Sequence, residues 1–431
     1  MTPLTRDLSD FLDASPCNFL AVRNLAERLE GEGFVCLDFR NRDALEAGGK
    51  YYYTVNGSAL IAFIVGDGEA SEGFKIISAH SDSPGFRIKP HAEMMCPGRI
   101  LKLNTEVYGG PILYTWFDRP LSISGRVILR NDADPLRPEI ITMKIDRPLL
   151  TIPHLAIHFN RQVNEGNPLS KQKDMLPVLA KLNADMEADN FLLKLIANEC
   201  GCDISDILDF DLTLYDTTKA CTFGADNEFI SSGRLDDLSM VHAGLTALLA
   251  TDPAGSRTRV LAIFDNEETG SGTKQGAASP ILDMVLRRVV EAKGGDEISY
   301  QQAVANSFMV SADNAHAVHP NYVEKQDPTN HPALGDGPVI KINANCKYMT
   351  DADSAAVFRA ICERAGVPVQ YFVNHSDVAG GSTLGNILTS QIPLRGVDMG
   401  AAIWAMHSVR ETASVADHAY IVDAFTEFYN I

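Results

Sequence analysis

The sequence predicts an α/β protein, a sheet flanked by helices on both faces and interrupted by a β-rich insert. In the last part of the chain, apolar residues between 238 and 249 share one helix face, and residues 259–264 and 308–311 form apolar strands. Such alternation is typical of a sheet with helices on both faces. From about 92 to 230 the segments are more β-like and reactive clusters are sparse. This contrast indicates an inserted module.

The pattern divides the chain into a split domain, residues 1–91 and 232–431, and an insert, residues 92–231. In the split domain, Pro16 and Gly31 are expected to begin and end a helix, since proline favours the first helical position and glycine the end. The other predicted elements are strands at 34–37, 51–55, 60–65 and 75–79, a helix opening at Pro280, an amphipathic helix at 414–429, strands at 125–129 and 139–145, and a more helical stretch at 175–200.

Composition excludes several classes of protein. The 431 residues carry 37 Lys and Arg against 56 Asp and Glu, a formal charge of 37 − 56 = −19, so a nucleic-acid partner is not expected. No apolar run reaches the ~18 residues that a membrane-spanning helix needs, and the first residues lack a secretory pattern. We therefore expect a cytoplasmic protein with no membrane partner. Its eight scattered cysteines favour free thiols, so nitrogen and oxygen atoms are the expected metal ligands.

Five short motifs hold residues suited to metal binding or proton transfer. They are His80 with Asp82, Asp236 with Asp237, Glu267 with Glu268, Asp313, and His407. Each has an ordinary alternative explanation: a solvated turn, an acidic helix start, a polar loop, or a satisfied core histidine. Three of the motifs nevertheless follow directly on an apolar strand, where ligands bind in open α/β sheets.

Taken jointly, these residues match the ligand set of a two-metal hydrolase. Imidazoles and carboxylates suit two divalent ions, Zn²⁺ first and Mn²⁺ or Co²⁺ as alternatives, and one carboxylate must bridge ions that lie ~3.5 to 4 Å apart. Glu267 would be left over as a general base. In the first motif, Asp82 would support the ligand His80 by a hydrogen bond.

The motifs also resemble a known family. Their order along the chain, from about residue 15 to the end, is similar to that of the aspartyl-aminopeptidase family of dinuclear metallo-aminopeptidases. The resemblance rests on residues 79–84, 106–110, 115–119, 152–158, 234–236, 265–271, 313–322, 337–341, 381–385 and 405–411. It implies a zinc-peptidase-type sheet, an inserted dimerisation domain, and release of single N-terminal residues, with acidic Asp or Glu as one candidate preference.

The resemblance also implies a role for each residue. Asp236 would bridge the ions, with His80 and Asp313 on one and Glu268 and His407 on the other. Glu267 would be the general base. Four further residues fall on positions that contact substrate, and these are His158, His316, Lys341 and Tyr348. His158 would act in a neighbouring subunit, and the subunits would form homodimers that build a tetrahedral homododecamer.

Some alternatives stay open at this point. The same residues suit another metal-dependent amide hydrolase, a carboxypeptidase or deacylase, and the fold could also serve a catalytically silent oligomeric binding protein. His154 and His158 could form a metal pair on a helix, although no acidic residue accompanies them as in His-Glu-x-x-His. The sequence departs from relatives at Asp237, where asparagine is frequent, and at residues 374–377, which leaves the specificity pocket undetermined.

Overall fold

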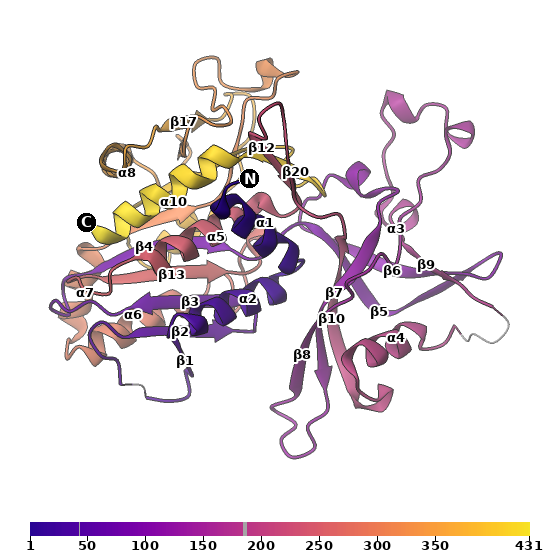
Figure 1. Cartoon of the computed structure of the whole chain (residues 1–431), viewed down its shortest axis with the longest axis horizontal. Coiled ribbons are helices and arrows are strands. Elements are labelled where there is room, and N and C mark those ends of the chain that lie inside the picture. The colour runs from indigo at the N-terminus through magenta and orange to yellow at the C-terminus, as the bar shows by residue number, and fades with distance from the viewer. Residues whose placement is uncertain (43, 184–187) are drawn as a thin grey trace. The chain divides into compact units, whose positions relative to one another are not determined.

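A computed structural model describes residues 1–42, 44–183 and 188–431. The chain forms two compact units (Figure 1). The first contains residues 1–82, 220–406 and 411–431, and the second contains residues 83–219 and 407–410. The first unit thus draws on both ends of the chain. The roles expected for the two parts, catalysis for the split domain and dimerisation for the insert, stay predictions. So do the predicted borders of the insert, near residues 92 and 231.

The first unit is built on a mixed sheet in the strand order β1-β2-β3-β13-β4-β14-β18-β16-β17. Its central strands β13, β4, β14 and β18 are parallel to one another. The strands are β1 (Val35–Leu37), β2 (Lys50–Val55), β3 (Ala59–Ile64), β4 (Phe74–His80), β13 (Thr258–Phe264), β14 (Phe308–Ala312), β16 (Val339–Ile342), β17 (Gln370–Val373) and β18 (Gly396–Gly400).

Helices cover both faces of this sheet, which explains why every residue of β3, β4, β13, β14 and β18 is buried. Side chains of α1, α2, α5, α8 and α10 pack on one face, and those of α6, α7 and α9 pack on the other. The helices are α1 (Pro3–Ala14), α2 (Asn18–Gly31), α5 (Leu235–Ala250), α6 (Ile281–Ala292), α7 (Glu297–Ala305), α8 (Ala352–Ala365), α9 (Leu384–Thr389) and α10 (Val415–Asn430).

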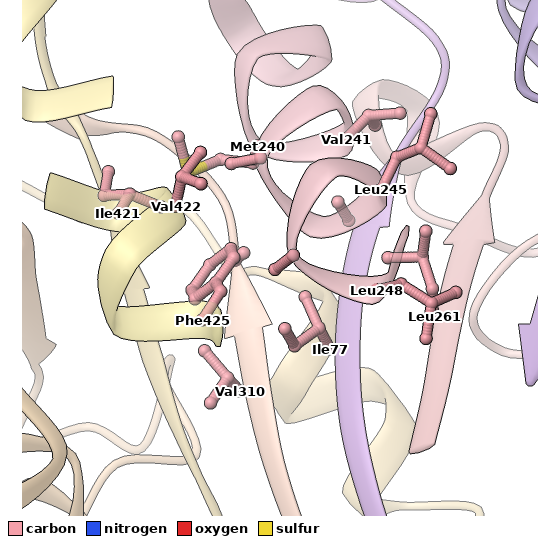
Figure 2. Close-up of a cluster of buried hydrophobic side chains, with 14 of the residues drawn as sticks. Ile77, Met240, Val241, Leu245, Leu248, Leu261, Val310, Ile421, Val422 and Phe425 are labelled. Atoms are coloured by element: carbon pink, nitrogen blue, oxygen red, sulfur yellow. The ribbon is translucent and has the colours of Figure 1, made fainter. Parts of the chain in front are cut away.

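Helices α5 and α10 form the centre of the larger core. Figure 2 shows Phe425 of α10 next to Ile77 and Val310 of the strands, and Leu248 of α5 next to Leu261. Gly244 of α5 lies so close to the sheet that an added Cβ would approach Leu261 to 2.6 Å. Packing at this density fixes α5 against the strand ends, and α5 carries Asp236 at its start.

Beside the main sheet, the first unit has a five-stranded sheet in the order β11-β12-β20-β19-β15. Its strands are β11 (Cys221–Phe223), β12 (Phe229–Ser232), β15 (Ala315–His316), β19 (Ala402–Trp404) and β20 (Glu411–Ser414). It ties the ends of β14 and β18 together, because β15 follows β14 and pairs with β19, which follows β18. The segments after two central strands are thereby held side by side.

The second unit is a six-stranded antiparallel sheet in the order β8-β7-β10-β5-β6-β9. It has its own apolar core, in which Phe86 meets Trp116 edge to face at 5.0 Å between ring centroids. The elements are β5 (Gly85–Cys96), β6 (Ile100–Tyr108), β7 (Leu121–Leu129), β8 (Glu139–Lys144), α3 (Lys171–Asp174), β9 (Val178–Lys181), α4 (Phe191–Cys200) and β10 (Ile207–Asp216). A strand-rich middle segment is therefore confirmed.

Most predicted elements are confirmed, and two need correction. The helix expected from Pro16 begins at Asn18, and Gly31 lies inside its last turn while Gly33 takes the positive φ of 83°. The stretch 175–200 is helical only from Phe191. Before that, Val178–Lys181 pairs with β6 as an edge strand. Residues 184–187 of this stretch lie outside the described part of the chain. Helix α1, which no sequence signal predicted, packs its buried face against α5.

Among the described residues, no helix is both long and apolar enough to cross a membrane. A polar network links four helices of the first unit. His242 of α5 shares a 3.0 Å hydrogen bond with His418 of α10, and its other ring nitrogen lies 2.8 Å from Asp7 of α1. Arg28 of α2 donates two hydrogen bonds to the same Asp7 carboxylate. His242 is therefore a satisfied core histidine.

This network predicts how stability depends on pH. Burial and the neighbouring His242 hold the pKa of His418 well below its usual range, whereas the unfolded chain has an ordinary histidine pKa of ~6.5. The contribution of a neutral His418 is thus fully present above about pH 6.5 and is lost as the pH falls through that value, by up to about 1.4 kcal/mol per pH unit. His418→Gln should flatten the fall in unfolding free energy between about pH 7 and 5 in urea titrations. His331→Gln, at an exposed site, is the control, and an equally steep fall in both variants would contradict this account.

Candidate metal centre

The candidate ligands lie where three parallel strands end. His80 is the last residue of β4, Asp313 follows β14, and Glu267 and Glu268 lie in a short 3-10 helix after β13. The three strands are neighbours and point the same way, so their carboxyl ends meet at one edge of the sheet. Asp236 comes from the start of α5, where it and Asp237 depart from helical φ and ψ and are joined by a cis peptide bond.

The side chains converge closely enough to hold ions. Ligand atoms of His80, Asp236, Asp237 and Asp313 lie within 4.8 Å of one another, and so do those of His80, Glu267 and Glu268. His80 belongs to both groups. Its Nε2 is 3.7 Å from Oδ1 of Asp236, a distance that leaves room for an ion between them. The structure thus brings together the five residues from four motifs to which the sequence gave a metal-binding or proton-transfer role, with Asp237 beside them.

Asp82 holds both His80 and the loop that carries Glu267 and Glu268. Its two carboxylate oxygens accept the backbone N–H groups of Glu267 and Glu268 at 3.1 and 3.2 Å. The Nδ1 atom of His80 lies 3.0 Å from the backbone carbonyl of Asp82 and 3.4 Å from its carboxylate. One buried side chain therefore orients His80 and fixes the loop that carries both glutamates, which is the arrangement expected around a metal-ligating histidine.

Burial and mutual repulsion disfavour charge on the acids of this cluster. Burial raises the pKa of Glu267 to about 8, with His80 opposing the shift and Asp313 adding to it. Burial and then the charge of Asp236 place the pKa of Glu268 well above its usual range. Burial disfavours charge on His80, but Asp237 and Asp82 outweigh it and raise the pKa of His80. Buried acids crowded in this way are stabilised by a bound cation.

Lys341 lies beside Asp313 and next to the ring of Tyr348. Lys341 of β16 places its Nζ atom 3.2 Å from Oδ1 of Asp313 and 5.7 Å from the centre of the Tyr348 ring. Burial opposes the charge on Lys341, yet Asp313 more than offsets it and raises the pKa of Lys341. Lys341 is only 4% exposed. Lys341 and Tyr348 thus form one wall next to the proposed ligands.

The remaining predicted residues lie further out or in the second unit. His316 is exposed at the end of β15, with its ring 5.9 Å from that of Phe372. His158 is exposed in a 3-10 turn of the second unit, and His154 precedes that turn, so the two do not form a pair on one helix face. His407 belongs to the segment 407–410 of the second unit, where its Nδ1 is 3.1 Å from the carbonyl of Gly110.

Sequence reasoning gave no role to three supporting carboxylates, although it noted one of them, Asp237, next to Asp236. Asp237 accepts the backbone N–H of His80 at 3.1 Å, and Glu411 accepts that of Asp236 at 3.0 Å. Asp265 is held by two 3.0 Å hydrogen bonds from Asn18. Asp265 directly follows β13, so the strand-end signal that pointed to Asp313 could have found it. Glu411 carries no such signal, because its partner is 175 residues away in the chain.

Comparisons with known proteins fit this geometry. Residues 11–429 match the family described as Aminopeptidase I zinc metalloprotease (M18). The chain belongs to the M18 family. It is 51% identical over 427 residues to a probable M18 family aminopeptidase 2 of Clostridium acetobutylicum, covering 99% of this chain and 98% of that one, and 44% identical over 430 residues to one from Pseudomonas aeruginosa, with the same coverage.

Solved structures of similar proteins share the fold. A chain in the cryo-EM structure of the Ape4 and Nbr1 complex has a TM-score of 0.94 at 37% identity, covering 99% of this chain and 85% of that one. The mApe1 dodecamer of S. cerevisiae has a TM-score of 0.86 at 27% identity, with coverage of 99% and 96%. This M18 chain is accordingly a metallo-aminopeptidase, and the expected α/β fold and hydrolase class are confirmed.

The residues present fit the zinc that the family description implies. The cluster offers imidazole nitrogen and carboxylate oxygen, which are normal zinc ligands. His80 is oriented through Nδ1, which leaves Nε2 directed toward Asp236. The described part of the chain therefore contains a buried site with the right donors and an excess of negative charge for a divalent ion.

Asp82 gives a direct test of this site. Asp82→Ala should lower zinc affinity by about 10- to 100-fold, because the 267–268 loop loses the carboxylate that holds it and His80 keeps only its contact with the backbone carbonyl. The measurement is a zinc titration against a competing chelator, with circular dichroism to confirm the fold. Asp132→Ala, at an exposed position, should bind zinc as the unaltered chain does. Equal zinc affinity in all three proteins would show that Asp82 does not support the site.

Proposed function

We propose that this M18 aminopeptidase removes single N-terminal residues from peptides with two divalent ions, bridged by Asp236. The observation that carries the proposal is the convergence of His80, Asp236, Glu268 and Asp313 with one further carboxylate, Glu267, at the same strand edge. His80 and Asp313 are proposed for one ion, and Glu268 with His407 for the other. His407 follows β19 by three residues, and its Nδ1 contact with Gly110 leaves Nε2 for a metal.

In this mechanism each residue of the chain has a separate task. Two bound divalent ions, zinc first and Mn²⁺ or Co²⁺ as alternatives, would polarise the scissile carbonyl and lower the pKa of water. Glu267 takes a proton from the attacking water and gives it to the leaving amine. Its place in a loop held by Asp82 keeps it beside the cluster without needing it as a ligand. Glu267 is half-buried, which limits its contact with bulk solvent.

The substrate end of the site is proposed to include His316, Lys341 and Tyr348. Lys341 is the cation placed to attract an acidic first side chain or a carboxylate. Its ammonium is, however, already paired with Asp313 and almost fully buried. An acidic substrate would compete with that pair, so we propose a modest preference for N-terminal Asp or Glu over neutral residues.

A second subunit is proposed to complete the site. His158 lies in a segment that exposes three apolar side chains to solvent, with Leu155 at 56%, Ile157 at 50% and Phe159 at 81%. Exposed apolar groups of this size indicate a surface that another protein covers. We propose that a second copy of the chain covers it and receives His158 at its substrate site. Such homodimers would build a tetrahedral dodecamer; the similar S. cerevisiae protein is a dodecamer.

The reaction can be tested directly. Free amino acids should appear from unblocked peptides, one residue at a time from the N-terminus, when the protein is assayed with Zn²⁺, Mn²⁺ and Co²⁺ in parallel. Peptides beginning with Asp, Glu, Leu or Lys would rank the first-residue preference, and N-acetylated copies are the control. Release from the C-terminus, or from acetylated copies only, would favour a carboxypeptidase or deacylase. If no amino acid is released with any peptide or metal, the remaining interpretation is a catalytically silent binding protein.

Glu267→Gln separates catalysis from metal binding. The amide keeps the shape of the side chain but cannot accept the water proton, so we expect kcat to fall by about 10²- to 10⁴-fold. Bound metal per chain, measured by elemental analysis, should not change. The same substitution at exposed Glu324 should leave both values unaltered. A kcat equal to that of the unaltered chain would rule out Glu267 as the general base.

A further inference from the structure

A buried carboxylate away from the metal ligands remains without a role. Asp398 lies in the middle of β18 and is 0% exposed, and its neighbours Val397 and Met399 face the larger apolar core. Its own side chain therefore points to the opposite face of the sheet. Burying a carboxylate in a central strand costs free energy that an apolar residue would not. The carboxylate of Asp398 is hydrogen-bonded to the segments around Met349 and Thr383.

Its carboxylate joins two segments from different parts of the chain. Oδ2 accepts the backbone N–H of Met349 at 2.6 Å, and Oδ1 accepts the hydroxyl of Thr383 at 2.8 Å. The backbone N–H of Asp398 donates to Thr350 at 2.8 Å, which fastens the same segment a second time. An added Cβ on Gly385 would approach Oδ1 to 2.7 Å, so the segment after Thr383 must pass directly over the carboxylate.

The first of these segments carries the wall of the substrate site. Tyr348 immediately precedes Met349, and its ring lies beneath the ammonium of Lys341. Asp398 and Lys341 are also related through the sheet. Strands β16 and β18 pair Val339 with Gly400 and Ile340 with Met399, so the next positions along the two strands are Lys341 and Asp398. Side chains at such positions share one face, where opposite charges attract.

From these contacts we propose that Asp398 is a positioning residue, which holds the Lys341 and Tyr348 wall against the segment at Thr383 and so sets how the first residue of the substrate binds. It acts through Met349 and Thr383 and touches neither substrate nor metal. The proposal rests on the function proposed above, because it assigns Lys341 and Tyr348 to the substrate site.

Asp398→Asn is the principal test. Asparagine keeps the volume but replaces one of the two charged acceptor oxygens by an NH2 group, so either the Met349 N–H or the Thr383 hydroxyl loses its carboxylate acceptor. We expect KM to rise about tenfold with kcat changed less than about threefold, because binding is weakened more than chemistry. The ratio of kcat/KM for Asp- and Leu-starting substrates should move toward one as Lys341 is released. Metal per chain should not change.

Thr383 supplies a milder pair of variants. Thr383→Val removes the donated hydroxyl at nearly constant shape and should raise KM in the same direction, whereas Thr383→Ser keeps the hydroxyl and should restore the unaltered value. A lowered melting temperature with normal KM in both Asp398→Asn and Thr383→Val would mean that the carboxylate is merely structural. A loss of metal, or a fall in kcat alone, would place its effect at the metal centre and overturn the proposal.

The outcome can be separated from a failure of the proposed function. The unaltered chain is assayed beside the variants with the same substrates and metals. If it releases amino acids and the variants match it in KM and in first-residue preference, only the role of Asp398 is wrong. If it releases none from any peptide, the proposed function fails, and the role of Asp398 in substrate binding fails with it.

Discussion

The crowding of buried and half-buried acids at one strand edge is the constraint on which the site depends. Asp236, Asp237, Glu267, Glu268 and Asp313 surround a single imidazole, that of His80. Such a group is unfavourable without a cation, since each charge is desolvated and repelled by the others. The fold sustains it through a dense apolar core under α5 and through backbone hydrogen bonds to Asp82, Asp237 and Glu411. A divalent ion is the natural remaining partner.

The support of the site explains which parts could be foreseen in the sequence. Apolar strands that end in His80 or Asp313 are local patterns, and the rule that parallel strands end together placed them at one edge. The supporting role of Asp82 could also be predicted, because Asp82 lies two residues from His80 in the sequence. The roles of Glu411 and Asp398 depend on partners far away in the chain, Asp236 and Met349, so no local pattern identifies them.

The fold shows the same contrast. Strands buried on both faces were predicted within a residue or two, because their apolar runs have no competing explanation. Helix α1 was missed and the stretch around residue 178 was assigned the wrong structure, since short amphipathic segments are decided by tertiary packing and not by propensity. The second unit, with its own core and an exposed apolar segment around His158, would in this view provide contacts between copies of the chain.

The central claim is that two ions share Asp236. Its most direct test is a crystal structure of the zinc-loaded protein, with anomalous diffraction collected on both sides of the zinc absorption edge. The account predicts two anomalous peaks per chain, ~3.5 to 4 Å apart, with one oxygen of Asp236 on each and Glu267 on neither. A single peak, or two peaks that Asp236 does not bridge, would contradict it.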